Sequence, residues 1–493
     1  MSDDLKAKTI RGVGWSTVQS WSVQLISFVV YPILARLLGP EAYGLIALAG
    51  VFIMMLDIFL DVSFGAAIEQ RKDLAPQHIN AVFWAFLALG LVLTSGSMLA
   101  APLIAKFFRE PALPPVIRWL SLGFLLQMVC GVQASLLRRE LRFRALAKRT
   151  LYATVSGAVV GITMAISGYG VWALVGQRLT TRVVTVIVLW RLSPWRPQRE
   201  FSPRHFHEVA GFGFSVMGNR VLSYLNQRLD QLLIGRYLDT VALGLYFNAQ
   251  RLMTLATGLL IGSYSQVAMP AFAKLQDDLP RLRAAFNKAC RFITLVAFPA
   301  FMLLAVLAEE LIVVVIGDKW RDSAPVLQML SLAGIILAVQ YVNGAAMMAV
   351  GRANLRLLVL AAHGLGNTIG FLLAVRHGIV AVAAAYTIRA YLLSPLDTLV
   401  NRRLGAVSVR GLMRAIHAQA IAAAVMGASL WYAKHRLFAD LDDILRLLTC
   451  ATLGLIVYTG TALLVDRSLW KDAFDLARHL LPRHRQTRTA ETR

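Results

Sequence analysis

The chain has 493 residues, of which 57% are hydrophobic and 16% are charged. Soluble domains carry about 25% charged residues, so this composition excludes a soluble globular protein and indicates a membrane protein. The formal net charge of +23 is compatible with binding to nucleic acid or to anionic lipid headgroups, and the position of the basic residues separates these two classes.

Apolar stretches follow one another along almost the whole chain. About 20 residues are needed to cross a hydrocarbon core about 30 Å thick. Breaks at polar residues, Pro and Gly predict spans at 14–37, 42–65, 80–105, 115–137, 149–168, 170–192, 209–234, 241–265, 290–317, 323–350, 354–375, 378–400, 413–433 and 443–465. The predicted fold class is therefore an all-α polytopic membrane protein of about 14 transmembrane helices.

The two halves of the chain repeat each other. An offset of about 200 residues aligns identical residues of the first and second halves, among them Arg36 with Arg236, Leu38 with Leu238, Ala42 with Ala242, Gly44 with Gly244 and Leu45 with Leu245. An offset of 210 aligns Pro115-Val116 with Pro325-Val326. Internal repeats in a hydrophobic chain are typical of transporters, whose halves move about a site at their interface.

The repeat predicts the domain organisation. The expected parts are an N-terminal lobe at 1–192, a cytoplasmic linker at 193–208, a C-terminal lobe at 209–400, two accessory spans at 401–465, and a basic amphipathic cytoplasmic tail at 466–493. Each lobe then holds six spans.

Lys and Arg are concentrated in alternate loops. The set of loops on the side of both termini holds most of them, and the positive-inside rule therefore places both termini in the cytoplasm. Because the charge lies where anionic headgroups would be, no nucleic-acid partner is expected. Cys130, Cys290 and Cys450 lie in apolar stretches without metal-ligand spacing, so we interpret them as small buried hydrophobic residues.

The predicted span at 209–234 is unusually polar for a membrane helix. Its polar residues form two neighbouring stripes at helical spacing, Asn219, Ser223, Asn226 and Asp230 in one and Arg220, Tyr224, Gln227 and Gln231 in the other, with Arg228 alongside. Lipid does not accommodate such a face, so we expect it to border a hydrated cavity. Packing alone would not require two arginines.

The equivalent span of the first half, 14–37, has the same character. Ser16, Ser20, Gln24, Ser27 and Tyr31 recur along it, and the 200-residue offset places Ser20 on Arg220 and Gln24 on Tyr224. We infer that both spans line one central cavity. The alternative for the first span is that its small polar residues serve helix packing.

Other charged residues lie within predicted spans. Arg251, Arg178, Arg182 and Arg389 are further candidates for the cavity, although the last three could instead neutralise a carboxylate or extend to the interface. Asp57 and Asp61 are four residues apart and share a helix face. They are candidates for coupling transport to a proton or Na⁺ gradient, and pairing with an arginine is the alternative. No cofactor or metal is predicted.

A basic stretch, Arg138 to Arg149, connects two spans of the first half. We interpret it as an anchor for lipid headgroups; a guide for an anionic substrate is the alternative. For the cavity itself, arginine predicts an anionic ligand, because guanidinium matches phosphate oxygens bidentately and stays charged.

Several motifs together resemble one family. They are Leu34-Ala35-Arg36-Leu37-Leu38-Gly39-Pro40, Leu137-Arg138-Arg139-Glu140-Leu141-Arg142-Phe143, Gly168-Tyr169-Gly170-Val171-Trp172-Ala173-Leu174, Ala242-Leu243-Gly244-Leu245-Tyr246 and Gly317-Asp318-Lys319-Trp320. In these the chain is similar to bacterial polysaccharide transporters of the Wzx/WzxC type, in the MOP superfamily of flippases and drug exporters. The resemblance extends from about residue 8 to residue 400.

The resemblance implies two bundles of six helices in a V with two extra C-terminal helices. It also implies translocation of undecaprenyl-pyrophosphate-linked oligosaccharides to the periplasmic face of the inner membrane, alongside polysaccharide polymerase and chain-length proteins. The alternatives are a drug/cation antiporter of the same superfamily, a peptidoglycan-precursor flippase, and a membrane polymerase or glycosyltransferase. An enzyme of that last kind would need a large extracytoplasmic loop or a clustered acidic metal motif, and the sequence has neither.

Overall fold

The computed structural model describes the chain except residues 1–2, 62–67, 69–74, 200–223, 225–226 and 469–493. Within the described residues the chain forms helices and no strand. The predicted amphipathic tail helix lies almost wholly in 469–493, outside the described residues.

The helices of the first half are α1 (Asp3–Leu37), α2 (Pro40–Asp61), α4 (Pro76–Phe108), α5 (Leu113–Val129), α6 (Gly131–Arg139), α7 (Phe143–Ile166) and α8 (Val171–Leu192). Residues 227–237 are helical. The later helices are α10 (Thr240–Thr257), α11 (Ser263–Ala273), α12 (Leu279–Val306), α13 (Ala308–Ile316), α14 (Ala324–Ala349), α15 (Ala353–Ala374), α16 (Ile379–Arg403), α17 (Val409–Tyr432) and α18 (Asp443–Val465), with short π or 3₁₀ segments at Gly258–Gly262, Asp318–Ser323, Val375–His377 and Ala433–Leu437.

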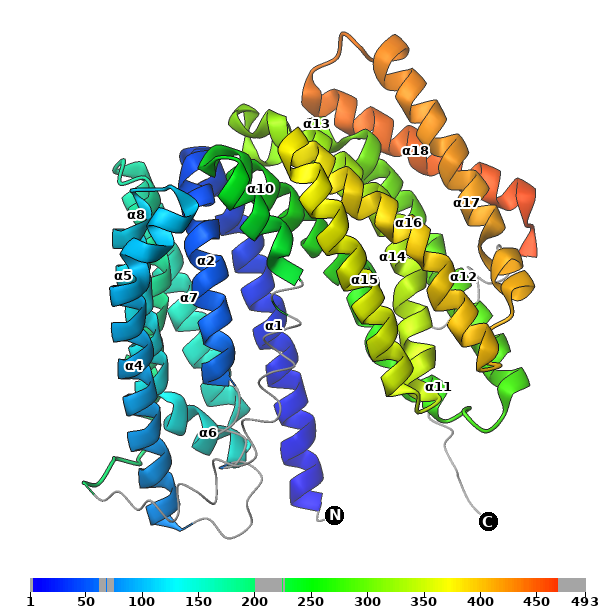
Figure 1. The fold of residues 1–493 in the computed structure, drawn as a ribbon. Coiled ribbons are helices and arrows are strands. Elements are labelled where there is room, and N and C mark those ends of the chain that lie inside the picture. The colour runs from blue at the N-terminus through cyan, green and yellow to red at the C-terminus, as the bar shows by residue number, and fades with distance from the viewer. Residues whose placement is uncertain (1–2, 62–67, 69–74, 200–223, 225–226, 469–493) are drawn as a thin grey trace, which may run out of the picture. The chain divides into compact units, whose positions relative to one another are not determined.

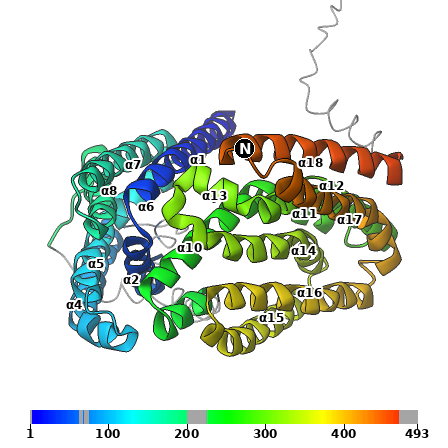
Figure 2. The same ribbon diagram turned by 90° about the horizontal axis from the view of Figure 1, so that it is seen from above.

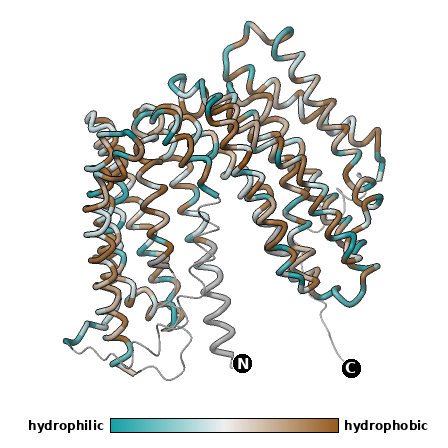
Figure 3. Tube along the Cα trace, viewed as in Figure 1, coloured by the Kyte–Doolittle hydropathy of each residue, from teal (hydrophilic) through white to brown (hydrophobic). Residues whose placement is uncertain are grey.

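The all-α membrane fold is confirmed. Ten helices among the described residues are long and apolar enough to cross a membrane, and α5 and α6, bent by 41° at their junction, meet the same criteria only when taken together. The predicted total of fourteen stays a prediction, because most of 209–234 lies outside the described residues. Figure 3 shows hydrophobic residues along the helices and hydrophilic ones mainly at their ends and connections.

Local sequence explains the start of α12 and the turn between α7 and α8. Asp278 precedes α12, and its side chain accepts a hydrogen bond from the Arg281 amide at 3.1 Å, which satisfies an orphan donor of the first turn. Between α7 and α8 the chain reverses through Gly168 and Gly170, whose φ angles are +79° and +55°. Glycine adopts such backbone angles without a Cβ clash, so the predicted division between these two spans is confirmed.

The chain groups into two compact units. Unit 1 comprises Met1–Leu252, Ile312–Val326 and Ala362–Arg389; unit 2 comprises Met253–Leu311, Leu327–Ala361 and Ala390–Arg493. Each is described by itself. The lobe and tail boundaries expected from the sequence stay predictions.

In unit 1 the pairs α4–α5 and α7–α8 lie side by side, and α1 packs on α7 (Figures 1 and 2). Small residues bring these helices close. A Cβ at Gly161 of α7 would lie 2.9 Å from the Gln177 side chain of α8, and one at Gly90 of α4 would lie 3.0 Å from Met128 of α5. Small residues at helix interfaces are what membrane helix packing requires, since lipid supplies no hydrophobic drive between helices.

The ends of the repeated segments also meet within unit 1. The buried indole of Trp320 donates to the Ala35 carbonyl at 2.8 Å and contacts the Tyr43 ring edge-to-face. The guanidinium of Arg36 donates to the Val314 and Val315 carbonyls at the end of α13. Residues from both halves of the sequence therefore hold this end of unit 1 together.

In unit 2, α17 packs between α12 and α18. Glu310 is buried and lies 3.0 Å from the Lys434 ammonium and 3.7 Å from the Arg446 guanidinium. These ion pairs attach the two C-terminal helices to the rest of the unit. Cys130, Cys290 and Cys450 are buried and unpaired in disulfides, which confirms their interpretation.

Large apolar side chains are exposed on both units. Leu99 of α4 is 79% exposed and Leu464 of α18 is 81% exposed. A soluble protein would bury such residues, whereas membrane helices present them to lipid.

Candidate functional site

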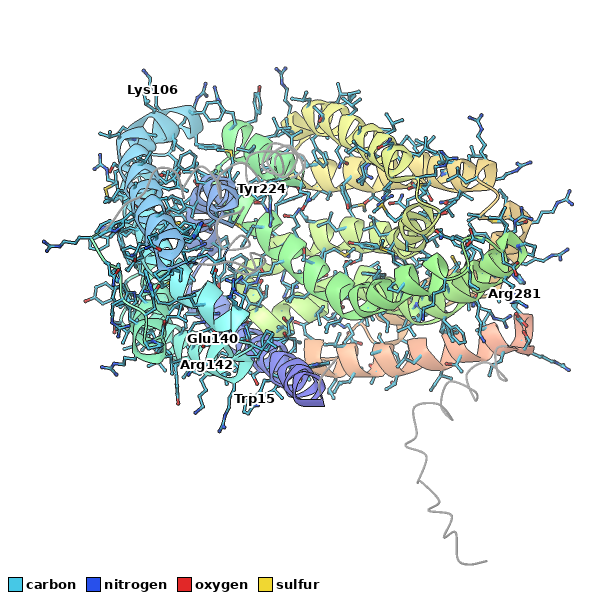
Figure 4. The ribbon with its side chains drawn as sticks, turned by 90° about the horizontal axis from the view of Figure 1, so that it is seen from below. Trp15, Lys106, Glu140, Arg142, Tyr224 and Arg281 are labelled. Atoms are coloured by element: carbon cyan, nitrogen blue, oxygen red, sulfur yellow. The ribbon has the colours of Figure 1, made fainter. Side chains whose placement is uncertain are left out.

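The polar span at 209–234 is described only in part. Asn219, Arg220 and Asn226 lie outside the described residues. The Tyr224 hydroxyl donates to the Val51 carbonyl of α2 at 3.0 Å, and its position is labelled in Figure 4. Gln227 is exposed, and Arg228 is partly buried.

The predicted polar face of α1 leads to a pocket in unit 1. Ser20 and Gln24 are exposed on α1, and Ser27, one turn further, lines the pocket. The empty volume is about 380 Å³, including its open mouth. Its polar lining comes from α1, α2, α7, α8 and α10, namely Ser27, Tyr31, Tyr43, Thr154, Gln177 and Arg251.

Two of the lining residues, Arg251 and Tyr31, contact each other, and we call the cavity the tyrosine–arginine pocket. The Arg251 guanidinium lies over the Tyr31 ring, 4.1 Å from its centroid. Such stacking orients a cation without neutralising it. The Tyr31 side chain is 5% exposed, and its hydroxyl has no hydrogen-bond partner among the described residues. A buried hydroxyl without a partner is costly, and a bound polar group would satisfy it.

The surroundings of the pocket are cationic. Arg178 of α8 interacts electrostatically with both Arg251 and Arg182. Asp57 of α2 lies 3.9 Å from Arg182, which also donates to the Gln127 side chain. Among the described side chains, three guanidinium groups therefore share this region with the carboxylate of Asp57, an arrangement that favours an anion.

Of the two predicted coupling residues, the structure describes the side chain of Asp57 only. Asp57 lies beside an arginine, as the alternative interpretation expected, and the side chain of Asp61 lies outside the described residues. Their assignment to ion coupling stays a prediction. Arg389 contacts the His363 ring at 2.8 Å, the Asn367 amide oxygen at 2.7 Å and the Tyr386 ring.

The sequence pattern places Asp230 in a polar stripe but does not identify the groups that contact its carboxylate. This buried carboxylate accepts hydrogen bonds from the Tyr246 hydroxyl at 2.8 Å, the Gln250 amide at 2.7 Å and the Gln231 backbone N–H at 2.8 Å. Neutral donors from α10 therefore satisfy it. Gln177, Thr154 and Tyr43 were also missed as site residues, because each is an ordinary polar residue of its own helix until the helices pack.

The described residues hold no group of three His, Cys, Asp or Glu side chains placed to bind a metal ion. The polar groups that line the pocket are hydroxyl, amide and guanidinium groups. These bind polar and anionic groups.

Comparison with known families decides the classification. The family model described as "Polysaccharide biosynthesis protein" matches residues 33–325. The chain belongs to this family. Its predicted resemblance to Wzx-type transporters of the MOP superfamily is confirmed.

Of three similar proteins with names from polysaccharide biosynthesis, one aligns with the whole chain and two with about 70% of it. Over 504 aligned residues the chain is 27% identical to the succinoglycan biosynthesis transport protein ExoT of Rhizobium meliloti (strain 1021), with 100% of both chains covered. It is 28% identical to the lipopolysaccharide biosynthesis protein WzxC of Escherichia coli (strain K12), covering 71% of this chain and 72% of WzxC. The teichuronic acid biosynthesis protein TuaB of Bacillus subtilis (strain 168) is 26% identical, covering 70% and 72%.

Two solved structures show the fold of this family member. The lipid II flippase MurJ in an inward closed conformation superposes with a TM-score of 0.75 at 14% identity, covering 93% of this chain and 99% of MurJ. A multidrug resistance MATE family transporter of the MOP superfamily, facing inward, gives a TM-score of 0.59 at 18% identity, covering 78% and 95%. The fold is therefore that of MOP superfamily transporters.

Proposed function

We propose that this protein is a flippase that translocates undecaprenyl-pyrophosphate-linked oligosaccharide repeat units across the inner membrane for exopolysaccharide, capsule or O-antigen assembly. The observation that carries the proposal is a family match over 33–325 combined with the fold of a lipid II flippase over 93% of the chain. The named relatives take part in succinoglycan, lipopolysaccharide and teichuronic acid biosynthesis.

The physical task of such a flippase is to offset the free-energy cost of removing water from the polar headgroup of the lipid. A lipid that carries a charged diphosphate and several sugars cannot cross hydrocarbon unaided, because removing water from charge and hydroxyls is too costly. A polar path through the protein supplies replacement hydrogen bonds while the lipid tail stays in the bilayer. A transporter of this kind binds and releases its cargo without breaking a bond.

The tyrosine–arginine pocket supports an anionic, hydroxyl-rich cargo. Arg251 and Arg178 supply positive charge, and Tyr31 supplies a buried hydroxyl that lacks a partner among the described residues. Guanidinium groups bind phosphate oxygens or acidic sugars, and the hydroxyl and amide groups of the lining bind sugar hydroxyls. The proposal retains a cationic central cavity lined by α1 and the polar span at 209–234, operated by alternating access.

The direction of transport rests on the proposed topology. With both termini cytoplasmic in the inner membrane, as the positive-inside rule expects, the cargo would load from the cytoplasmic leaflet and leave at the periplasmic face. A proton or Na⁺ gradient is the proposed driving force. Polysaccharide polymerase and chain-length proteins are the proposed partners downstream.

The fold likeness to a MATE transporter favours a multidrug/cation exporter as the second candidate. Cells that lack this protein distinguish the two. A flippase predicts full-length lipid-linked oligosaccharide accumulating on the cytoplasmic leaflet and clearing on re-expression. Normal lipid-linked pools together with altered drug or dye retention would support the exporter instead.

The central cavity has a separate test. Arg220→Ala should abolish glycan export while the amount of protein in the membrane stays unchanged. Normal export by this variant would remove Arg220 from the transport path.

A further inference from the structure

The connection between α5 and α7 is a folded elbow. Helix α6 departs from the line of α5 by 41°. Its buried face packs into a hydrophobic cluster formed by Cys130, Ala134, Leu137, Leu146 and Leu189. This packing fixes the elbow against α7 and α8, so its charged residues have defined positions.

The elbow is strongly cationic. Its charged residues are Arg138, Arg139, Arg142, Arg144, Lys148 and Arg149, with Glu140 as the carboxylate. Glu140 lies 3.5 Å from Arg142, and the Arg144 guanidinium lies over the Trp15 ring of α1 at 5.4 Å. Figure 4 shows Trp15, Glu140 and Arg142 gathered at one edge of unit 1.

A row of polar groups leads from the elbow to the tyrosine–arginine pocket, along the contact between α1 and α7. Gln19 of α1 donates to the Thr150 hydroxyl of α7 at 3.0 Å. Thr154 lies one turn further on the same face of α7 and lines the pocket together with Ser27. This polar seam therefore connects the cationic elbow with the candidate site.

Arg149 lies at the start of the seam. Its guanidinium donates to the Thr150 hydroxyl at 2.9 Å, but its buried Nε finds no hydrogen-bond partner in the part of the chain that the structure describes. No carboxylate of the described residues forms an ion pair with it. A partly buried cation without an anion is costly at the edge of a membrane. Phosphate oxygens would satisfy both the charge and the free N–H.

We propose that the elbow and the polar seam form a loading site for the phosphate-bearing headgroup of a lipid-linked glycan, with Arg149 as the residue that receives the phosphate. The proposal rests on the flippase function above and names where the cargo first binds. The headgroup of a bulk phospholipid could be bound by the exposed arginines of the elbow alone. The position of Arg149 behind them, on a seam that ends at the pocket, favours the transported lipid as the occupant.

A binding experiment tests the loading site without requiring transport. The full-length protein is placed in phosphatidylcholine nanodiscs, and the equilibrium binding of radiolabelled farnesyl diphosphate is measured. Arg149→Gln should bind about tenfold more weakly, the loss expected for one charge-assisted hydrogen-bonding group. Arg149→Lys keeps the charge and should bind within about threefold of the unmodified protein.

Arg191→Gln is the matched control. Arg191 is an exposed arginine in the last turn of α8, beside residues that pack on the elbow, and its loss should leave binding unchanged. Replacing part of the phosphatidylcholine by phosphatidylglycerol should also leave it unchanged. Equal weakening by Arg191→Gln, loss of binding in phosphatidylglycerol, or unchanged binding by Arg149→Gln would each overturn the proposal.

The two proposals fail in different experiments. If the flippase function is wrong, lipid-linked oligosaccharide will not accumulate in cells lacking the protein. If only the loading site is wrong, that accumulation will occur, and Arg149→Gln will bind farnesyl diphosphate and clear the accumulated lipid as well as the unmodified protein does. An unfolding temperature within the range of the unmodified protein confirms that the variants are folded.

Discussion

Gly44 and Gly244 pack directly against each other in unit 1. A Cβ on Gly244 would lie 3.1 Å from the Gly44 amide nitrogen and would overlap the Pro40 carbonyl, and a Cβ on Gly44 would overlap the Thr240 carbonyl. These residues are equivalent pairs of the 200-residue repeat. The two halves of the sequence therefore meet through equivalent residues of the equivalent helices α2 and α10, and we call this contact the joint. Each glycine faces the first residue of the other helix, Gly44 facing Thr240 and Gly244 facing Pro40.

This reciprocity extends to neighbouring residues. Arg36 bonds the end of α13, and its equivalent Arg236 lies over the Phe107 ring at the end of α4. The Thr240 hydroxyl donates to Glu110, and Trp320 donates to Ala35. Under the 210-residue offset Glu110 corresponds to Trp320. The joint therefore contains two similar sets of contacts, and in each set residues of one half of the sequence bind residues at a helix end of the other half.

The first prediction concerns the glycine contact. Gly44→Ala should destabilise the protein by about 1–3 kcal/mol, because the added methyl group has no space between the helices. The unfolding temperature of the purified protein measures this. Gly96→Ala is the control, since nothing lies within 4 Å of that position on α4. It should stabilise by up to about 1 kcal/mol, the helix preference of Ala over Gly. Equal changes in unfolding temperature for the two variants would show that close packing at Gly44 does not stabilise the protein.

The second prediction concerns the pocket. Tyr31→Phe removes a buried hydroxyl that has no partner among the described residues, so the free energy of unfolding should stay equal or rise. Glycan export should fall about tenfold if this hydroxyl binds cargo, the loss expected for one hydrogen bond of about 1.4 kcal/mol. Tyr152→Phe, at a residue of α7 that is 57% exposed, should change neither quantity. Normal export by Tyr31→Phe would exclude the hydroxyl from cargo binding.

The sequence predicted the helices and the repeat well, because both depend on local pattern. Apolar stretches of spanning length identify helices, and Gly168 and Gly170 mark the turn between α7 and α8. The pocket was only partly predictable. Tyr31 belongs to a polar stripe that is visible in the sequence, but its contact with Arg251 joins residues 220 positions apart, and no periodicity within one helix reports such a pair.

Charged residues were the hardest to interpret from the sequence. In the sequence, Asp57 and Asp230 are both carboxylates within predicted spans, and the pattern does not distinguish their environments. Packing gives one an arginine at 3.9 Å and the other three neutral donors. The identity of a partner depends on which helix lies alongside, and a single sequence does not contain that information.

The third prediction concerns the attachment of the C-terminal helices. Glu310→Gln should destabilise the protein by about 1–3 kcal/mol, because it removes the buried carboxylate that Lys434 and Arg446 share. The two cations keep their contacts to Glu309 at 3.7 Å and Asp443 at 3.6 Å, respectively. Thermal unfolding in detergent provides the measurement. Glu41→Gln, at an exposed position of α2, is the control and should be nearly neutral. A neutral Glu310→Gln would show that these ion pairs do not hold α17 and α18.

The fourth prediction concerns pH. Burial alone would raise the pKa of the Asp466 carboxyl, but hydrogen bonds from Ser468 and the charge of Arg291, 3.0 Å away, lower this pKa below its ordinary value. A lowered pKa stabilises the folded state above the unfolded pKa of about 3.9, and the gain is lost as the pH falls through the folded pKa. Asp466→Asn should therefore unfold at a lower temperature at neutral pH.

The difference between this variant and the unmodified protein should close as the pH falls through the lowered folded pKa of Asp466, because the carboxyl is then protonated in both the folded and the unfolded state. Asp440→Asn, at an exposed carboxylate, should match the unmodified protein at either pH. A difference at Asp466 that persists in acid would show that its contribution is not electrostatic.

Reconstitution tests the flippase function most directly. Purified protein is placed in liposomes with an undecaprenyl-pyrophosphate-linked oligosaccharide on the inner leaflet only, and a membrane-impermeant glycosidase reports the fraction that reaches the outer leaflet. The account predicts that the protein, but not its Arg220→Ala variant, exposes the lipid-linked glycan to the enzyme. Liposomes that export a cationic dye while the glycan stays protected would contradict it.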